Sequence, residues 1–98
     1  MGFFNAMTSI GEINRLIKDF ENQVTITQGQ VQDDASMVTL NNSLNVLKSI
    51  HQELIYKFSN SSGARVAMYK MFGKKMQMDE LLTYTKNVIY NLNAIINN

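Results

Sequence analysis

The chain contains no cysteine, no proline and no tryptophan among its 98 residues. Without cysteine it can form no disulfide, and it offers no thiolate as a nucleophile or a metal ligand. The absence of proline favours long helices, because proline breaks helix interiors and punctuates loops. No apolar run approaches the roughly 18–20 residues that a helical membrane span requires. We therefore expect a soluble chain without a membrane span.

The first residues also lack the features of a targeting segment. Between Met1 and Met7 there is neither the basic region nor the long apolar run of a signal peptide. Ala6 stands where the myristoylation pattern requires Ser or Thr. These absences favour a cytoplasmic protein, and they leave export without a signal peptide open.

Charge is sparse, since Asp, Glu, Lys and Arg make up 17% of the chain and the formal net charge is +1. This balance argues against strong steering of the whole protein towards nucleic acid or anionic membrane. The charge is unevenly distributed, however, because no acidic residue lies between Lys57 and Lys75. Asparagine supplies much of the polar surface instead. A bias to Asn, Ile and Lys is typical of an AT-rich genome and favours a bacterium or its phages as the source.

Residues 37–58, read as a helix, carry one continuous heptad seam. Its a and d positions are Met37, Leu40, Leu44, Leu47, His51, Leu54 and Phe58. Such a seam predicts a helix that packs along its whole length against another helix. We expect it to end near Ser59, and Asp33, Asp34 or Ser36 to cap its start.

A helix with an apolar line from Ile10 to Val24 is predicted before this seam. Ser9 begins a capping box, although the same line extends back to Phe3 and allows an earlier start. The β-branched run over residues 24–27 lowers helix propensity. We therefore expect this helix to end near residue 27 and a loop to follow over about 28–35.

Two further helices are predicted after the turn at residues 60–63. A short one covers about 63–72, with Gly73 as its C-terminal cap. The last helix runs from about Asp79 to Ile96 and has a wide apolar arc, which is typical of contact with two neighbours. The sequence thus predicts an all-α fold in a single domain, residues 1–98. It is a small antiparallel bundle of three long helices plus one short helix, which dimerisation could complete.

His51 is the only histidine and lies in the middle of the apolar seam. A lone histidine lacks the second ligand of a metal site and the nucleophile of a catalytic triad. We interpret it as a packed, hydrogen-bonded residue that fixes helix register, with pH-sensitive packing as the alternative. The candidate register and packing residues of the seam are Leu40, Leu44, Leu47, His51, Leu54 and Phe58. We predict no catalytic residue, no metal site and no cofactor, and an enzyme is not expected.

The segment 65–78 combines four of the seven methionines with two aromatic residues and four bases. Methionine recurs at surfaces that accept a partner helix, because its side chain is adaptable and polarisable. The simpler interpretation is a connecting helix whose methionines fill the core. The candidate partner-binding residues are Arg65, Met68, Tyr69, Lys70, Phe72, Lys74 and Lys75.

The favoured function is protein–protein interaction, of the binding, immunity, secretion-partner or inhibitor type. Self-association as a homodimer is expected, because a domain this small buries only part of its apolar helix faces. The alternative is a DNA-binding regulator. In that case the second helix, the turn at Gly63 and the third helix form a helix-turn-helix, and the basic region 57–75 contacts DNA.

Overall fold

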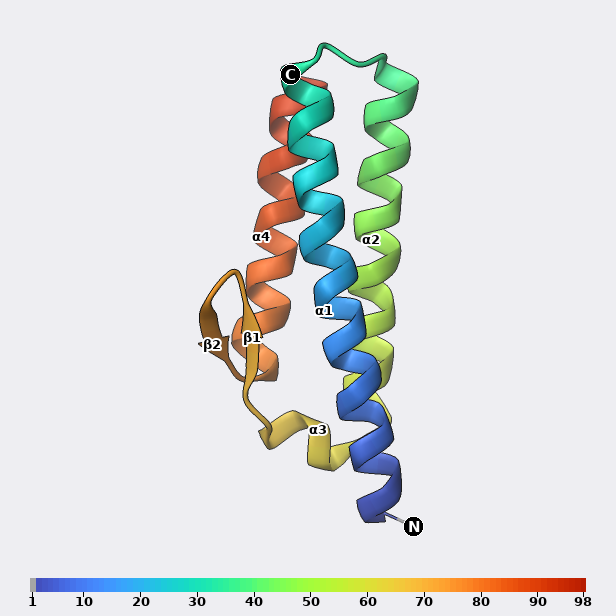
Figure 1. The fold of residues 1–98 in the computed structure, drawn as a ribbon, viewed down its shortest axis with the longest axis vertical. Coiled ribbons are helices and arrows are strands. Elements are labelled where there is room, and N and C mark those ends of the chain that lie inside the picture. The colour runs from blue at the N-terminus through green and yellow to red at the C-terminus, as the bar shows by residue number, and fades with distance from the viewer. Residues whose placement is uncertain (1) are drawn as a thin grey trace.

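The computed structural model describes the backbone of residues 2–98 and the side chains of residues 9–98. Three long helices lie side by side: α1 (Gly2–Gln32), α2 (Met37–Ser59) and α4 (Met78–Asn97). Between α2 and α4 come the short helix α3 (Ser62–Val66) and an antiparallel hairpin of β1 (Tyr69–Met71) and β2 (Lys74–Met76). The predicted bundle of three long helices and one short helix is confirmed, while the hairpin is an addition to it (Figure 1).

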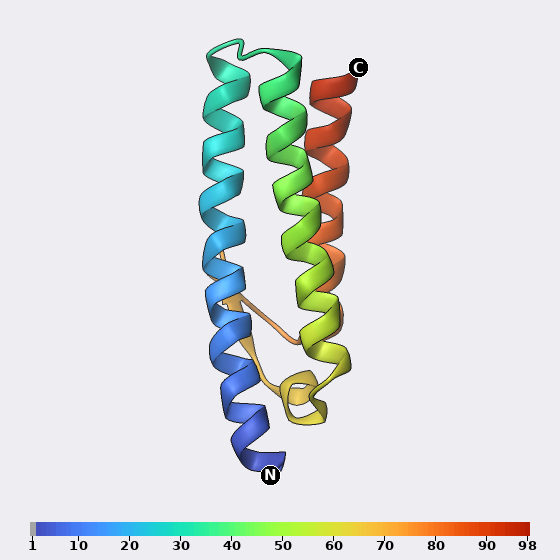
Figure 2. The same cartoon turned by 90° about the vertical axis from the view of Figure 1, so that its right-hand side faces the viewer.

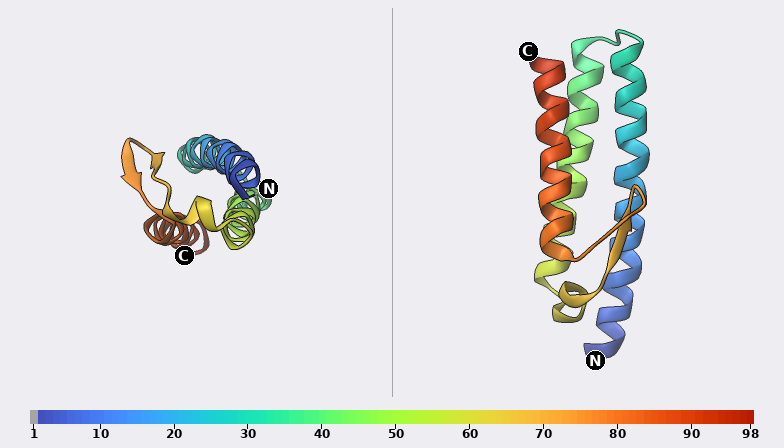
Figure 3. Two further views of the ribbon diagram at one scale, coloured as in Figure 1. Left: turned by 90° about the horizontal axis from the view of Figure 1, so that it is seen from below. Right: turned by 90° about the vertical axis from the view of Figure 1, so that its left-hand side faces the viewer.

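Helix α2 is the central element of the bundle. It runs antiparallel to α1 and α4 and packs against both, whereas α1 and α4 make little contact with each other (Figure 2). Seen along the bundle axis, the three helices occupy three corners, and the hairpin lies on the remaining side between α1 and α4 (Figure 3). Strand β1 contacts both of these helices. The molecule is elongated, with extents of 48 × 21 × 17 Å.

The predicted seam of α2 supplies the centre of the core. Leu44, Leu47, Leu54 and Phe58 are at most 1% exposed, and Leu40 is buried as well. Full burial of side chains of this size stabilises the fold by about 1.5–3 kcal/mol each. Two positions of the seam depart from the pattern: Met37 lies in the first turn of α2 and is exposed, and His51 is only partly buried.

Helix α1 continues to Gln32, so the prediction that it ends near residue 27 is wrong. Tertiary burial outweighs the low propensity of the β-branched run, because Val24 and Thr27 lie on the buried face. The hydroxyls of Thr25 and Thr27 are satisfied within the helix. They donate to the main-chain carbonyls four residues earlier, at 3.2 and 2.8 Å respectively.

The same helix begins at Gly2, so the capping box at Ser9 does not form. Ser9 lies inside α1, where its main-chain groups belong to the helix. The earlier start that the apolar line allowed is therefore the observed one. The side chain of Phe3, on which that line depended, lies outside the described side chains.

A Schellman-type turn ends α1. Asp34 has a left-handed backbone (φ 54°), its N–H donates to the Val31 carbonyl, and the N–H of Ala35 donates to the Gln30 carbonyl at 2.9 Å. Ser36 then caps α2 by accepting a hydrogen bond from the main-chain N–H of Thr39. The loop is therefore shorter than predicted, and of the three predicted caps Ser36 is the one that forms.

The prediction of a helix over 63–72 is wrong beyond Val66. Tyr69 and Met71 are buried while Lys70 between them is exposed, which is the two-residue period of a strand. The strands pair in the register Tyr69↔Met76, Lys70↔Lys75 and Met71↔Lys74. Gly73 is a turn residue and not a helix cap. With φ values of 50° at Phe72 and 80° at Gly73, the turn has the two positive φ angles that a type I′ hairpin requires.

The left-handed backbone at Asp34 can be tested by substitution with glycine. Asp34→Gly should raise the free energy of unfolding by about 0.5–1 kcal/mol, because glycine adopts the left-handed conformation without strain. Asp33→Gly removes the same charge at a position without a positive φ, and should lower the free energy of unfolding by a similar amount. Urea unfolding of both variants measures the difference. Equal destabilisation by both would contradict this description of the turn.

Candidate functional site

An apolar groove runs along the bundle between α1 and α4. It consists of two adjoining hollows of about 390 and 330 Å³ that share Gln28, Leu92 and Ile95. We call this continuous feature the α1/α4 groove. Its lining residues are Val24, Gln28, Val31 and Gln32 of α1, Tyr84, Val88, Asn91, Leu92 and Ile95 of α4, and Phe72 of the hairpin turn.

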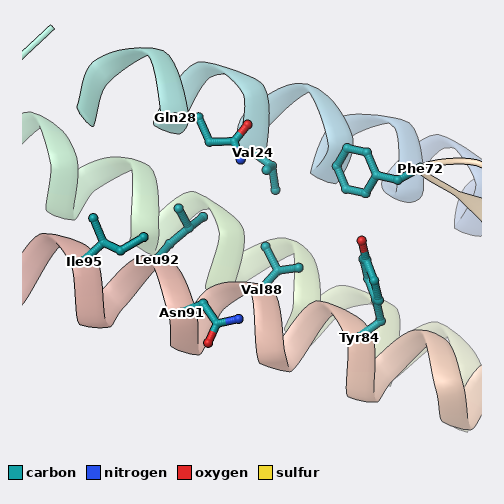
Figure 4. A pocket seen from close by; sticks show the side chains of 8 residues that line it. All are labelled: Val24, Gln28, Phe72, Tyr84, Val88, Asn91, Leu92 and Ile95. Carbon is teal, nitrogen blue, oxygen red and sulfur yellow. The ribbon is translucent and has the colours of Figure 1, made fainter. Parts of the chain in front are cut away.

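The groove has a buried floor and an exposed rim. Val24 and Leu92 are 5% and 6% exposed, whereas Ile95 is 61% exposed. In Figure 4, Val24 and Gln28 project from α1 towards α4, and Val88 projects from α4 towards α1. The wide apolar arc predicted for the last helix explains this arrangement. One part of the arc packs on α2, and the other part faces the groove instead of a second helix.

Phe72 closes the hairpin end of the groove. Its left-handed backbone costs about 1–2 kcal/mol for a residue with a side chain, and strain of this kind concentrates at functional sites. The Phe72 N–H donates to a carboxylate oxygen of Glu21 at 2.8 Å, which fixes the turn against α1. The half-exposed ring lies 6.3 Å from the ring of Tyr84, measured between centroids. The hairpin therefore holds an aromatic ring at the end of the groove.

No charged side chain is among the residues that line the groove. Its polar groups are the amides of Gln28, Gln32 and Asn91 and the hydroxyl of Tyr84. The acidic pair Asp33 and Asp34 follows Gln32 at one end. The groove thus offers apolar contact and neutral hydrogen bonds to a ligand, with negative charge just beyond one end.

The predicted partner-binding residues divide between surface and core. Lys70 and Lys75 are directly opposite each other on the outer face of the hairpin, where two like charges repel. Lys74 is also exposed, and Met68 is 58% exposed. Among these candidates, Phe72 is the one that lines the α1/α4 groove.

Arg65 and Tyr69 serve the fold. Arg65 donates to the main-chain carbonyls of Phe58 at 3.1 Å and Ser59 at 3.5 Å, which satisfies the C-terminal end of α2. Tyr69 is 2% exposed, its hydroxyl donates to the Ala64 carbonyl at 2.7 Å, and its ring meets Phe58 edge-on. Burial raises the pKa of Tyr69 to about 12.

The segment 65–78 buries two of its methionines and lacks most of its predicted helix. Met71 and Met76 are fully buried under the hairpin but Met68 is exposed, so the simpler interpretation holds for part of this segment, and its connecting helix ends at Val66. The helix over 63–72 that would have served as a recognition helix does not form. Five residues of α3 and a β-hairpin stand in its place.

His51 joins α2 to α4 through a hydrogen bond with Thr85, with 2.7 Å between its Nδ1 and Thr85 Oγ1. The Thr85 hydroxyl also contacts the Leu82 carbonyl at 3.1 Å, and the tautomer of the imidazole decides which of His51 Nδ1 and Thr85 Oγ1 donates in the shorter bond. Burial of the ring, and then the positive charge of Lys86, lower the pKa of His51. The residue is therefore a neutral, half-buried hydrogen-bonding partner that ties the register of α4 to that of α2.

Among the residues that the structure describes, no three His, Asp or Glu side chains gather as a metal site would require. Over the same part of the chain, no helix is long and apolar enough to cross a membrane.

Sequence reasoning missed the residues that form the groove walls. Val31 was assigned to a loop, and Val88 and Ile95 were counted simply as part of an apolar arc. The one signal for them was the width of that arc. Comparison of the chain with protein-family models, with curated protein sequences and with solved structures gives no match.

The neutral state of His51 predicts a dependence of stability on pH. Because its pKa is lower in the folded chain than its usual 6.5, the unfolded chain binds more protons below that pH. Folding stability should thus be complete above about pH 6.5 and fall on acidification. In His51→Gln the loss between about pH 7.5 and pH 5.5 should be smaller than in the wild type.

Urea unfolding at several pH values measures this loss. The ion pair of Glu12 with Lys57 does not interfere, because that contact lowers the pKa of Glu12 from its usual 4.5. Parallel pH profiles for the wild type and His51→Gln would contradict the assignment of a neutral, hydrogen-bonded histidine.

Proposed function

We propose that this protein acts by binding another protein and that the α1/α4 groove is its binding surface. The observation that supports this most strongly is an open apolar groove in the body of the bundle, walled by Val88 and Ile95 on one side and Val31 on the other. Uncovered apolar surface of this kind typically marks a site of interaction.

The packing of α1 and α4 against α2 keeps this groove open. Helices α1 and α4 are each held against α2, so neither can move to cover the other without losing its packing in the core. The hairpin covers the space between them over only one part of its length (Figure 3), and its turn residue Phe72 lines the groove that remains. An occupant from outside the chain would gain the free energy of covering this surface.

The character of the lining favours a protein as that occupant. Aliphatic side chains and three amides form a long, shallow surface without a charged group, which suits the apolar face of a protein segment. Binding, immunity, secretion-partner and inhibitor roles all need such a surface. The DNA-binding alternative has less support, because the helix over 63–72 on which it depended is replaced by a hairpin.

A matched pair of isoleucines tests this proposal. Ile95 on the groove rim and Ile26 on the opposite side of α1 are 61% and 51% exposed, so lysine at either position should leave the fold intact. Ile95→Lys places a charge against the occupant and should reduce partner capture from extracts of the host roughly tenfold. Ile26→Lys should capture as the wild type does.

Quantitative pull-down with the three tagged proteins is the measurement, and circular dichroism checks the fold of each variant. Light scattering over a range of concentrations shows whether the captured partner is a second copy, as the expected homodimer requires. Equal capture by all three proteins would contradict a role for the groove in binding.

A further inference from the structure

We propose that the occupant of the α1/α4 groove is an amphipathic helix of another protein, about three turns long. It lies antiparallel to α1 and α4, with its N-terminal end beside Asp33 and Asp34. This inference rests on the proposed function, and it adds the kind of partner, its chemistry and its direction.

The shape of the bundle leaves room for one helix. In the view along the axis the helices occupy three of the four corners of a four-helix bundle, and α3 and the hairpin fill the fourth over one part of its length (Figure 3). Beyond the ring of Phe72, apolar residues of α1 and α4 line that corner from both sides. A helix placed there would complete the bundle.

The length of the groove sets the length of the helix. Eleven residues separate Tyr84 from Ile95 on α4, which corresponds to about 16 Å at 1.5 Å per residue. This is about three helical turns. At the hairpin end the half-exposed ring of Phe72 provides a stop.

A second copy of the folded chain fits less well. The described side chains form no continuous exposed apolar stripe that could enter the groove of another copy. On α2, the exposed side chains of Val38, Val46 and Tyr56 are about 12 and 15 Å apart along the helix, and exposed polar residues separate them.

The lining of the groove predicts which residues the partner helix turns towards it. We call these residues the partner's stripe. A charged residue facing Val24, Val88 or Leu92 would lose its hydration without gaining an opposite charge. Small polar residues are acceptable, because the amides of Gln28 and Asn91 can donate and accept hydrogen bonds. We therefore expect apolar residues at i, i+3 or i+4 and i+7, with Ser, Thr, Asn or Gln as the only polar members.

The direction of the bound helix follows from the negative charge at one end of the groove. Asp33 and Asp34 stand beyond Gln32 with no basic residue in the loop, and they favour the positive N-terminal end of a helix dipole. At the hairpin end, three lysines lie near three carboxylates, so that end contributes little preference. These are Lys70, Lys74 and Lys75 on the hairpin, Glu21 on α1, and Asp79 and Glu80 on α4. Antiparallel packing against α1 and α4 gives the same direction, because the dipoles of neighbouring helices then oppose each other.

The test uses a displayed library of helical peptides of about four turns, slightly longer than the groove so that both ends can be reached. The stripe positions vary among apolar, small polar and charged residues, and the library is selected against the immobilised full chain. Peptides with an uncharged stripe should be enriched on the wild type and on Ile26→Lys. Ile95→Lys should bind these peptides about tenfold less tightly. Gln28→Arg changes an exposed residue of the opposite wall of the groove and serves as a second blocking variant.

Cross-linking then measures direction. Because the chain has no cysteine, Gln32→Cys marks the acidic end of the groove and Lys74→Cys marks the hairpin end. With oxidised glutathione as the oxidant, an enriched peptide with a cysteine at its N-terminus should form a disulfide with Gln32→Cys faster than with Lys74→Cys. The same peptide with a C-terminal cysteine should show the opposite preference.

Each outcome separates this inference from the proposed function. If enriched peptides lose binding to Ile95→Lys but cross-link in the reverse direction, the groove binds protein and the direction inferred here is wrong. If no peptide is enriched and the wild type dimerises while Ile95→Lys stays monomeric, the occupant of the groove is a second copy. The proposal of a helix from another protein is then wrong. If peptides bind the wild type and both blocking variants equally, the groove is not the site and both proposals are overturned.

Discussion

The apolar seam of α2 is the constraint on which the rest of the structure depends. Leu44, Leu47 and Leu54 are fully buried because two separate helices cover them, α1 from one side and α4 from the other. Each flanking helix gains its stability from α2 and little from its neighbour. Polar contacts reinforce the same pattern, with Gln30 bonded to Ser43 between α1 and α2, and Thr85 bonded to His51 between α4 and α2.

An open corner follows from this arrangement. Since α1 and α4 are both fixed to α2, the space between them must be filled by something else, and the chain supplies a hairpin over only part of it. The cost of that hairpin is visible at Phe72, whose left-handed backbone is offset by its hydrogen bond to Glu21 and by packing against Tyr84. Beyond this residue the apolar walls of the α1/α4 groove have no cover from the described residues. The functional proposals both start from that fact.

Sequence periodicity predicted the elements whose burial is regular. The seam of α2 and the bounds of α4 follow from a 3.6-residue period, and known capping chemistry limited the cap of α2 to Asp33, Asp34 or Ser36. Local helix propensity gave the wrong end of α1 at residues 24–27, where tertiary burial overrides it. Periodicity failed at the hairpin, where three-residue strands and a Phe-Gly turn give almost no local signal. The groove itself could not be predicted, because Val88 on its wall and Leu81 in the core have the same character in sequence, and only the placement of α1 distinguishes them.

Methyl NMR with a water-soluble paramagnetic cosolute tests most directly whether the groove is open in the free protein. The account predicts strong broadening of the methyl signals of Ile95 and intermediate broadening of those of Val88, with those of Leu47 and Leu54 unaffected. The signal of Ile26 provides the reference for full exposure. If Val88 and Ile95 are protected as well as Leu47 is, the space between α1 and α4 is covered in solution and the central claim is wrong.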